Sequence, residues 1–204
     1  MGMDLDMRFY ILMVRSHVLG WLQTLGYVYR LGIWVEELMR VGTHIYTLCE
    51  LSSTLVVHPF SPGSESTDQQ KGPISRHSIL PPADSSNGPK MLASEIILLP
   101  SHNGGKHLLV CTNRDTPNNE GDALALFSVG DDGSVERTEQ GWVEGVGRHL
   151  RGMLPDKSGQ WVAVAGRDEG GVTIFERDVS GTGLRLDKVA HLEVDQVVVP
   201  LWID

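Results

Sequence analysis

Apolar and polar positions alternate along most of this chain in a pattern typical of β-strands and turns. An apolar run is followed by a polar break and then by a second, β-branched run. Three segments share this order: 44–60, 108–127 and 161–175. Their polar breaks begin at Glu50, Arg114 and Arg167, respectively. Each segment predicts a β-hairpin, and because a hairpin cannot bury its own apolar face, we expect the copies to pack against one another.

Further strand signals extend each hairpin to a unit of about four strands. Apolar stretches that end at a proline enter the repeat, and they are 94–99, 148–154 and 196–199. Proline cannot donate to a strand ladder, so it is a suitable end for each of them. Short outer strands are expected near Ile74, Val135 and Leu184. The pattern predicts an all-β protein, namely a partial β-propeller of about three four-stranded antiparallel blades in residues 42–204.

Residues 1–41 share nothing with these repeats and are rich in Leu, Trp, Tyr and Met. Their longest stretch without a charged residue is 16–29, which is shorter than the ~20 residues that cross a bilayer. Asp4 and Asp6 stand where a signal peptide would be basic. We therefore expect a separate N-terminal segment of doubtful origin. It is either a short helical or irregular piece or the product of a misplaced start or a retained intron.

Composition narrows the classes of partner. A net charge of −9 argues against nucleic acid and against an anionic membrane surface, because both attract clustered Lys and Arg. Cys49 and Cys111 lie inside apolar strand runs, so two buried thiols in a reducing, cytoplasmic setting are favoured over a disulfide. The histidines lack metal-ligand spacing and no nucleotide-binding motif is present, so we expect no metal and no cofactor.

Several stretches resemble the lactonase family of seven-bladed β-propellers. They are ELSSTLVV, LLVCTNRD, the run GRHLRGMLPDKSGQWVAVAGRDEGGVTIF and the closing VVVPLWID. The resemblance covers residues 42–204, or about the last three blades. The family includes propeller-type 6-phosphogluconolactonases and fungal carboxy-cis,cis-muconate cyclases. The resemblance implies that this chain hydrolyses a sugar lactone such as 6-phosphogluconolactone. The alternative that it implies is the isomerase activity of a muconate cyclase.

The resemblance also implies site residues. The family's proposed active site uses His, Arg, Glu and Arg at the mouth of the central channel. Its Glu corresponds to Glu50, a candidate general acid or base, and its second Arg to Arg114, which would hold an anionic group and stabilise an oxyanion. Arg148 and His149 begin an inner strand and are expected to bind substrate, although Gly147 stands where the family often has Pro. The family's His and first Arg have no counterpart in this chain.

Other interpretations remain for each feature. Glu50 can simply end a strand at the surface, and Arg114 can form a solvated ion pair with Asp115 that contributes little. The whole chain can be a non-catalytic binding module or an inactive truncated fragment rather than an enzyme. The expected partner is a small lactone or carboxylate. Open blade edges would also favour self-association.

Overall fold

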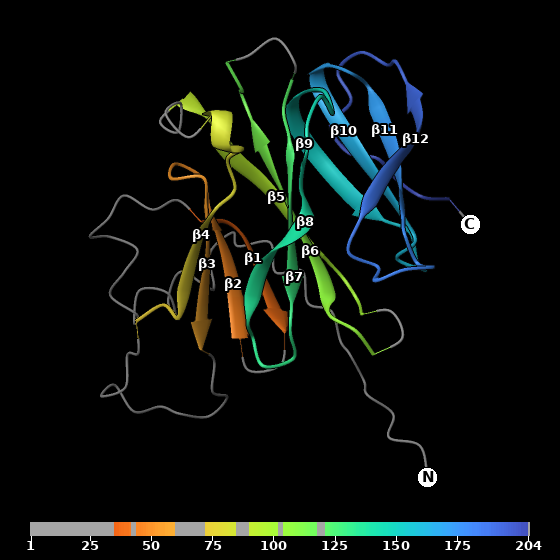
Figure 1. Cartoon of the computed structure of the whole chain (residues 1–204). Helices are drawn as coiled ribbons and strands as arrows, with labels where there is room; N and C mark the ends of the chain where they lie inside the picture. Colours follow the sequence, from red (N-terminus) through yellow and green to blue (C-terminus); the bar gives the residue numbers. More distant parts are fainter. Residues whose placement is uncertain are drawn as a thin grey trace.

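The computed structural model describes residues 35–41, 44–59, 72–84, 90–101, 104–117 and 121–203. Of the N-terminal segment expected over residues 1–41, helical or irregular, residues 1–34 lie outside these ranges. The regular secondary structure of the described part consists almost entirely of β-strands (Figure 1). In chain order the strands are β1 (Val35–Val41), β2 (His44–Cys49), β3 (Thr54–Pro59), β4 (Ser75–Ser78), β5 (Leu92–Leu99), β6 (His107–Arg114), β7 (Leu124–Val129), β8 (Val135–Val143), β9 (Arg148–Pro155), β10 (Trp161–Glu169), β11 (Val172–Arg177) and β12 (Leu186–Leu192).

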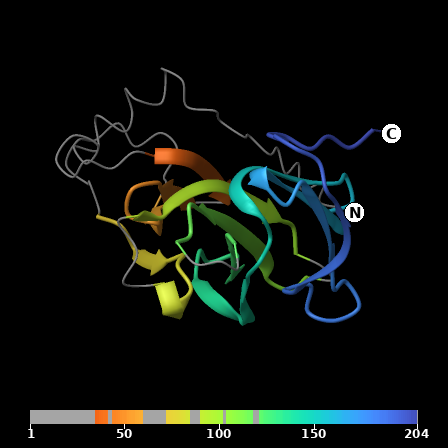
Figure 2. The same cartoon turned by 90° about the horizontal axis from the view of Figure 1, so that it is seen from above.

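The strands form three four-stranded antiparallel sheets, each ordered as in the chain: β1–β4, β5–β8 and β9–β12. We call these sheets the first, second and third blades. Viewed from above, the second blade lies between the first and the third (Figure 2). The leading strand β5 neighbours both β1 and β9, as the innermost strands of adjacent propeller blades do. The predicted all-β partial propeller with three blades is confirmed.

The first blade begins earlier than the sequence predicted. Residues 35–41 form β1, which pairs along its length with β2 and has an irregular register near Glu37. The expected boundary at residue 42 is therefore wrong by seven residues, the length of β1. The sequence VEELMRV lacks the regular alternation of a half-buried strand. Pairing with β2 decides its conformation, as is common for strands whose local preference is weak.

Two apolar cores lie on either side of the second blade. One, between the first and second blades, includes Leu48, Leu109 and Phe127. The other, between the second and third blades, includes Leu108 and Phe175. Successive side chains of β6 point to opposite faces of its sheet, so each face meets a different core. This explains why the run LLVC in β6 is apolar at every position.

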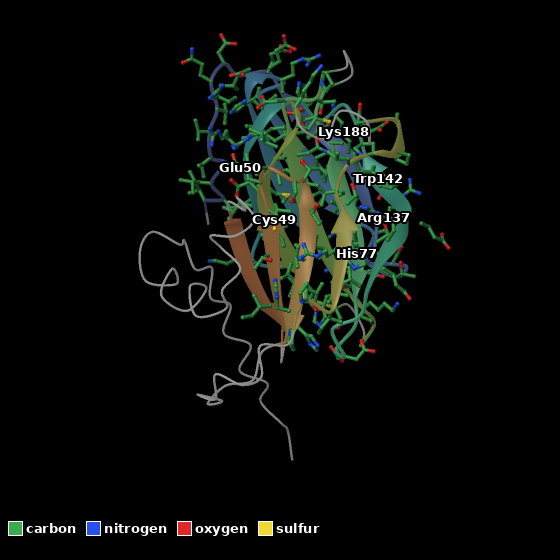
Figure 3. The ribbon with its side chains drawn as sticks, turned by 90° about the vertical axis from the view of Figure 1, so that its left-hand side faces the viewer. Cys49, Glu50, His77, Arg137, Trp142 and Lys188 are labelled. Carbon is green, nitrogen blue, oxygen red and sulfur yellow. The ribbon has the colours of Figure 1, made fainter. Side chains whose placement is uncertain are left out.

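An arginine clamp ties the outer strands of the first two blades together. The Arg137 guanidinium carbon lies 3.9 Å from the Phe127 ring centroid and 4.0 Å from that of Trp142. Arg137 also donates to the Ser78 carbonyl, and the Trp142 indole N–H donates to the Ile79 carbonyl at 3.1 Å. Burial lowers the pKa of Arg137 to about 10. Figure 3 shows Arg137 and Trp142 on the side of the molecule that carries the first blade.

The end of the chain differs from the expectation. Residues 196–199 do not form the predicted strand. The segment instead lies against β9, where a Cβ atom added to Gly152 would stand 2.4 Å from the Val198 carbonyl oxygen. The Trp202 indole N–H donates to the Leu154 carbonyl at 3.1 Å. A strand needs a neighbouring ladder, and the segment has none among the described residues.

Candidate functional site

Glu50 and Arg114 come together where the first blade meets the second. Glu50 directly follows β2, and Arg114 is the last residue of β6. An Arg114 Nη2 hydrogen bond to Glu50 Oε1 joins them, and their side chains are only 5% (Arg114) and 16% (Glu50) exposed. In Figure 3, Glu50 lies at the upper end of the first blade, above Cys49. The pair is thus neither a strand end in water nor the solvated Arg114–Asp115 pair considered above.

Main-chain contacts hold this pair in place. The Glu50 carbonyl accepts a hydrogen bond from the Ala93 N–H at 3.1 Å, which fixes the end of β2 against the start of β5. Arg114 Nη1 lies 3.5 Å from Ser94 Oγ, the next residue on β5. The main chain of Glu50 and the side chain of Arg114 are therefore both anchored to β5. Because the pair is largely shielded from water, its charges interact more strongly than exposed ones would.

His149 of β9 is held by Asp115, which follows Arg114. Their side chains meet at 2.7 Å, between His149 Nδ1 and Asp115 Oδ1. Arg151 Nε lies 3.1 Å from the other ring nitrogen, Nε2. An arginine can only donate, so Nε2 accepts and Nδ1 carries the ring proton. Both Asp115 and His149 have left-handed backbones, with φ of 62° and 56°, a strain that often marks functional positions.

Arg148 reaches from β9 to both neighbouring segments. Its Nε donates to Glu169 Oε2 at 2.9 Å, and its Nη1 donates to the Thr116 carbonyl at 3.4 Å. Nearby, Arg167 binds both carboxylate oxygens of Asp168 and holds the pKa of Asp168 below its ordinary value. Asp168 is therefore a carboxylate at neutral pH, and it lies 3.8 Å from His149 Nδ1. The third blade thus adds further cations to the same end of the sheets.

Asp122 is a structural member of this region that sequence reasoning missed. Its side chain is fully buried in the loop before β7. Oδ1 accepts from the Thr116 N–H at 2.8 Å, and Oδ2 accepts from the N–H groups of His149 and Leu150 at 2.6 and 3.3 Å. Asp122 therefore ties the loop after Arg114 to the start of β9. An acidic residue directly before an apolar strand was its only signal in the sequence.

All four predicted site residues thus lie at one end of the three sheets. Glu50 contacts Arg114 directly, while Arg148 and His149 contact the two residues that follow Arg114. Asp115 of the second blade and Arg151 of the third, which were not predicted as site residues, complete this network. A carboxylate and several guanidinium groups can together move a proton and stabilise an oxyanion.

Comparison with known proteins identifies the family. Residues 35–201 match the family described as Lactonase, 7-bladed beta-propeller. The chain belongs to this lactonase family. No curated protein matches the chain. Within the described ranges, no helix is long and apolar enough to cross a membrane, and no group of three His, Cys, Asp or Glu side chains could hold a metal ion.

Solved structures share the fold of this lactonase-family chain. A Bacteroides fragilis protein described as a candidate 6-phosphogluconolactonase aligns with a TM-score of 0.58 and 22% identity, over 83% of this chain and 42% of its own. A Lactobacillus plantarum protein aligns at 0.60 and 19%, over 80% and 44%. The periplasmic gluconolactonase of Pseudomonas aeruginosa aligns at 0.57 and 20%, over 79% and 41%. The chain therefore spans less than half the length of these structures.

Proposed function

We propose that Glu50 and Arg114 belong to a site that hydrolyses a sugar lactone such as 6-phosphogluconolactone. The observation that carries this proposal is the shielded Glu50–Arg114 pair between two blades. A desolvated ion pair is a poor source of stability, because the loss of hydration offsets much of the attraction. A role in chemistry accounts for the pair better. Membership of the lactonase family supports the same reaction class.

The proposed reaction follows from the two groups. The Glu50 carboxylate takes a proton from a water molecule, whose oxygen attacks the lactone carbonyl. The Arg114 guanidinium stabilises the oxyanion that forms on the carbonyl oxygen. When the intermediate collapses, the bond from the carbonyl carbon to the ring oxygen breaks. Glu50 then returns its proton to that oxygen, which leaves as the hydroxyl of the product acid. Arg148 is proposed to contact the substrate from the third blade.

Turnover of 6-phosphogluconolactone by the full chain and two variants tests this proposal. Glu50→Gln keeps the shape of the side chain but cannot take a proton, and Arg114→Ala removes the cation. We expect each to lower kcat by about 100-fold or more, in the range typical of general-base and oxyanion groups. Glu136→Gln is the matched control, because Glu136 is exposed and lies at the opposite end of the second blade. Unchanged turnover in the first two variants would refute these roles.

A muconate cyclase is the second candidate. The guanidinium groups of Arg114 and Arg148 lie at the same end of the sheets, which suits a substrate with several carboxylates. Conversion of carboxy-cis,cis-muconate, without hydrolysis of 6-phosphogluconolactone, would select this reaction. Absence of both activities in a folded protein would favour a non-catalytic binding module or an inactive fragment instead.

Two further properties belong to this proposal. Cys49 and Cys111 are both buried, which suits a reducing cytoplasm, and fractionation of source cells would test that location. Self-association is the second property. Large apolar side chains near the end of the third blade are exposed, including Leu192, Val199 and Leu201. We propose that a second copy of the chain covers them, because apolar surface of this kind favours burial.

A further inference from the structure

Arg151 differs from the other arginines at this end of the sheets. Arg114, Arg148 and Arg167 each form an ion pair with a carboxylate. Arg151 is half-buried on β9, and its Nε donates to His149 Nε2 at 3.1 Å. In the part of the chain that the structure describes, Arg151 makes no ion pair and no other hydrogen bond. Arg151 helps to lower the pKa of Asp168, but that carboxylate is already paired with Arg167, so no carboxylate within the described ranges is bonded to Arg151 itself.

The contact with His149 orients this guanidinium without neutralising it. Nδ1 of His149 gives its proton to the hydrogen bond with Asp115, so the Nε2 that faces Arg151 is an uncharged acceptor. Only the Nε of Arg151 is engaged, which leaves both terminal nitrogens for a ligand. Two terminal N–H groups of a guanidinium match the spacing of two oxygens of a carboxylate or a phosphate.

The backbone around this contact is held firmly. The left-handed conformations of Asp115 and His149 are strained, and the buried Asp122 fixes the N–H of His149 at 2.6 Å. Such strain persists only where surrounding contacts enforce it, and it is often found at ligand-binding positions. The hydrogen bonds between Asp115 and His149 and between His149 and Arg151 therefore hold the Arg151 guanidinium in one orientation.

We propose that Arg151 binds the anionic group of the substrate, a phosphate or a carboxylate, and that His149 positions Arg151 rather than contacting the substrate. This refines the expectation that His149 itself binds substrate. The inference rests on the proposed function for the identity of the substrate as a lactone. It implies that the preferred substrate carries a charged group beside its lactone ring, unlike glucono-δ-lactone.

Binding is measured separately from turnover, so the two proposals can fail independently. The probes are 6-phosphogluconate for a phosphate and cis,cis-muconate for a carboxylate, and calorimetry of the full chain gives Kd for each. Arg151→Gln is expected to weaken binding of at least one probe about 10- to 100-fold, the usual effect of losing a hydrogen bond to a charged group. Because 6-phosphogluconate also carries a carboxylate, a loss for 6-phosphogluconate alone indicates a phosphate, whereas a loss for muconate indicates a carboxylate. Arg185→Gln is the matched control and should leave both Kd values unchanged, because Arg185 is exposed and paired with Asp187 at the opposite end of the third blade.

Variants of His149 separate positioning from a merely structural role. Glutamine can still accept a hydrogen bond from Arg151, whereas leucine cannot, and both side chains face the same backbone strain. His149→Gln should therefore keep most of the affinity for the probe, while His149→Leu should lose it as Arg151→Gln does, without a matching difference in Tm.

Three outcomes would overturn the inference. They are wild-type protein that binds neither probe, wild-type affinity in Arg151→Gln, and an equal loss in Arg185→Gln. A different result would separate the two proposals. If the wild-type chain binds a probe but hydrolyses no lactone, and Arg151→Gln loses the probe, the anion site is supported and only the proposed reaction is refuted.

Discussion

Replacement of Asp122 by alanine tests how the site is held together. The Asp122 carboxylate accepts hydrogen bonds from the main-chain N–H groups of Thr116, His149 and Leu150. Alanine would leave all three donors without their acceptor. Main-chain bonds between Asp122 and residues 146 and 147 would remain, so the loop should keep its place beside β9. The change therefore isolates the carboxylate.

The expected cost can be worked out from these contacts. A buried donor left without a partner costs about 1–3 kcal/mol. Three such donors therefore cost about 3–6 kcal/mol of unfolding free energy, because water that reaches the N–H groups recovers part of the loss. A domain is stable by only about 5–15 kcal/mol, so this is a large fraction of the total. For a chain of this length it corresponds to a fall in Tm of about 10–20 °C.

Urea denaturation and hydrogen exchange would check this value. Asp122→Ala should lower the free energy of unfolding by the amount above, and the amides of Thr116, His149 and Leu150 should lose protection first. Asp122→Asn keeps one acceptor oxygen and should cost about half as much. Asp132→Ala is the surface control, because Asp132 is exposed and its side chain accepts from the N–H of Ser134 in a turn. An Asp122→Ala stability within about 1 kcal/mol of wild type would refute the reasoning.

Three further changes have defined outcomes. Burial raises the pKa of Tyr46 to about 12, and its hydroxyl has no hydrogen-bond partner among the described residues. Tyr46→Phe should therefore match or exceed wild-type stability at pH 7, by up to about 1 kcal/mol. Wild-type stability should fall as pH rises through about 10 to 12, where only the unfolded tyrosine ionises, and the variant should show less of this fall in thermal melts. Gly152→Ala should displace the segment at Val198 and speed its cleavage in limited proteolysis, since the added Cβ would lie 2.4 Å from the Val198 oxygen. Leu192→Ser should reduce self-association in sedimentation velocity without lowering Tm, because Leu192 is 63% exposed; unchanged association would argue against that surface.

The hairpins were the most predictable part of the fold. Their apolar and β-branched runs bury side chains on both faces in β6 and on alternate faces in β11, so periodicity alone revealed them. Two segments were predicted wrongly for the same reason. Residues 35–41 carry little strand pattern yet pair with β2, whereas residues 196–199 carry the pattern yet have no described ladder to join. Pairing partners, rather than local preference, decided both.

For the candidate site, too, the sequence indicated some features and not others. Glu50 and Arg114 stood out because each begins the polar break of a repeated hairpin, and equivalent positions in neighbouring blades lie at the same end of the sheets. The sequence also indicated Arg148 and His149 from their place at the start of a leading strand. Their roles as groups in a reaction stay predictions.

By itself the sequence determined the repeat, the all-β class and the end of each blade where charged residues collect, because these depend on local periodicity and turn chemistry. The tertiary structure alone decided which charges meet. Arg114 pairs with Glu50 rather than with its neighbour Asp115, and Asp115 turns to His149 on the next blade. Contacts between blades join residues far apart in the chain, and their geometry depends on how the sheets pack, which no local pattern encodes.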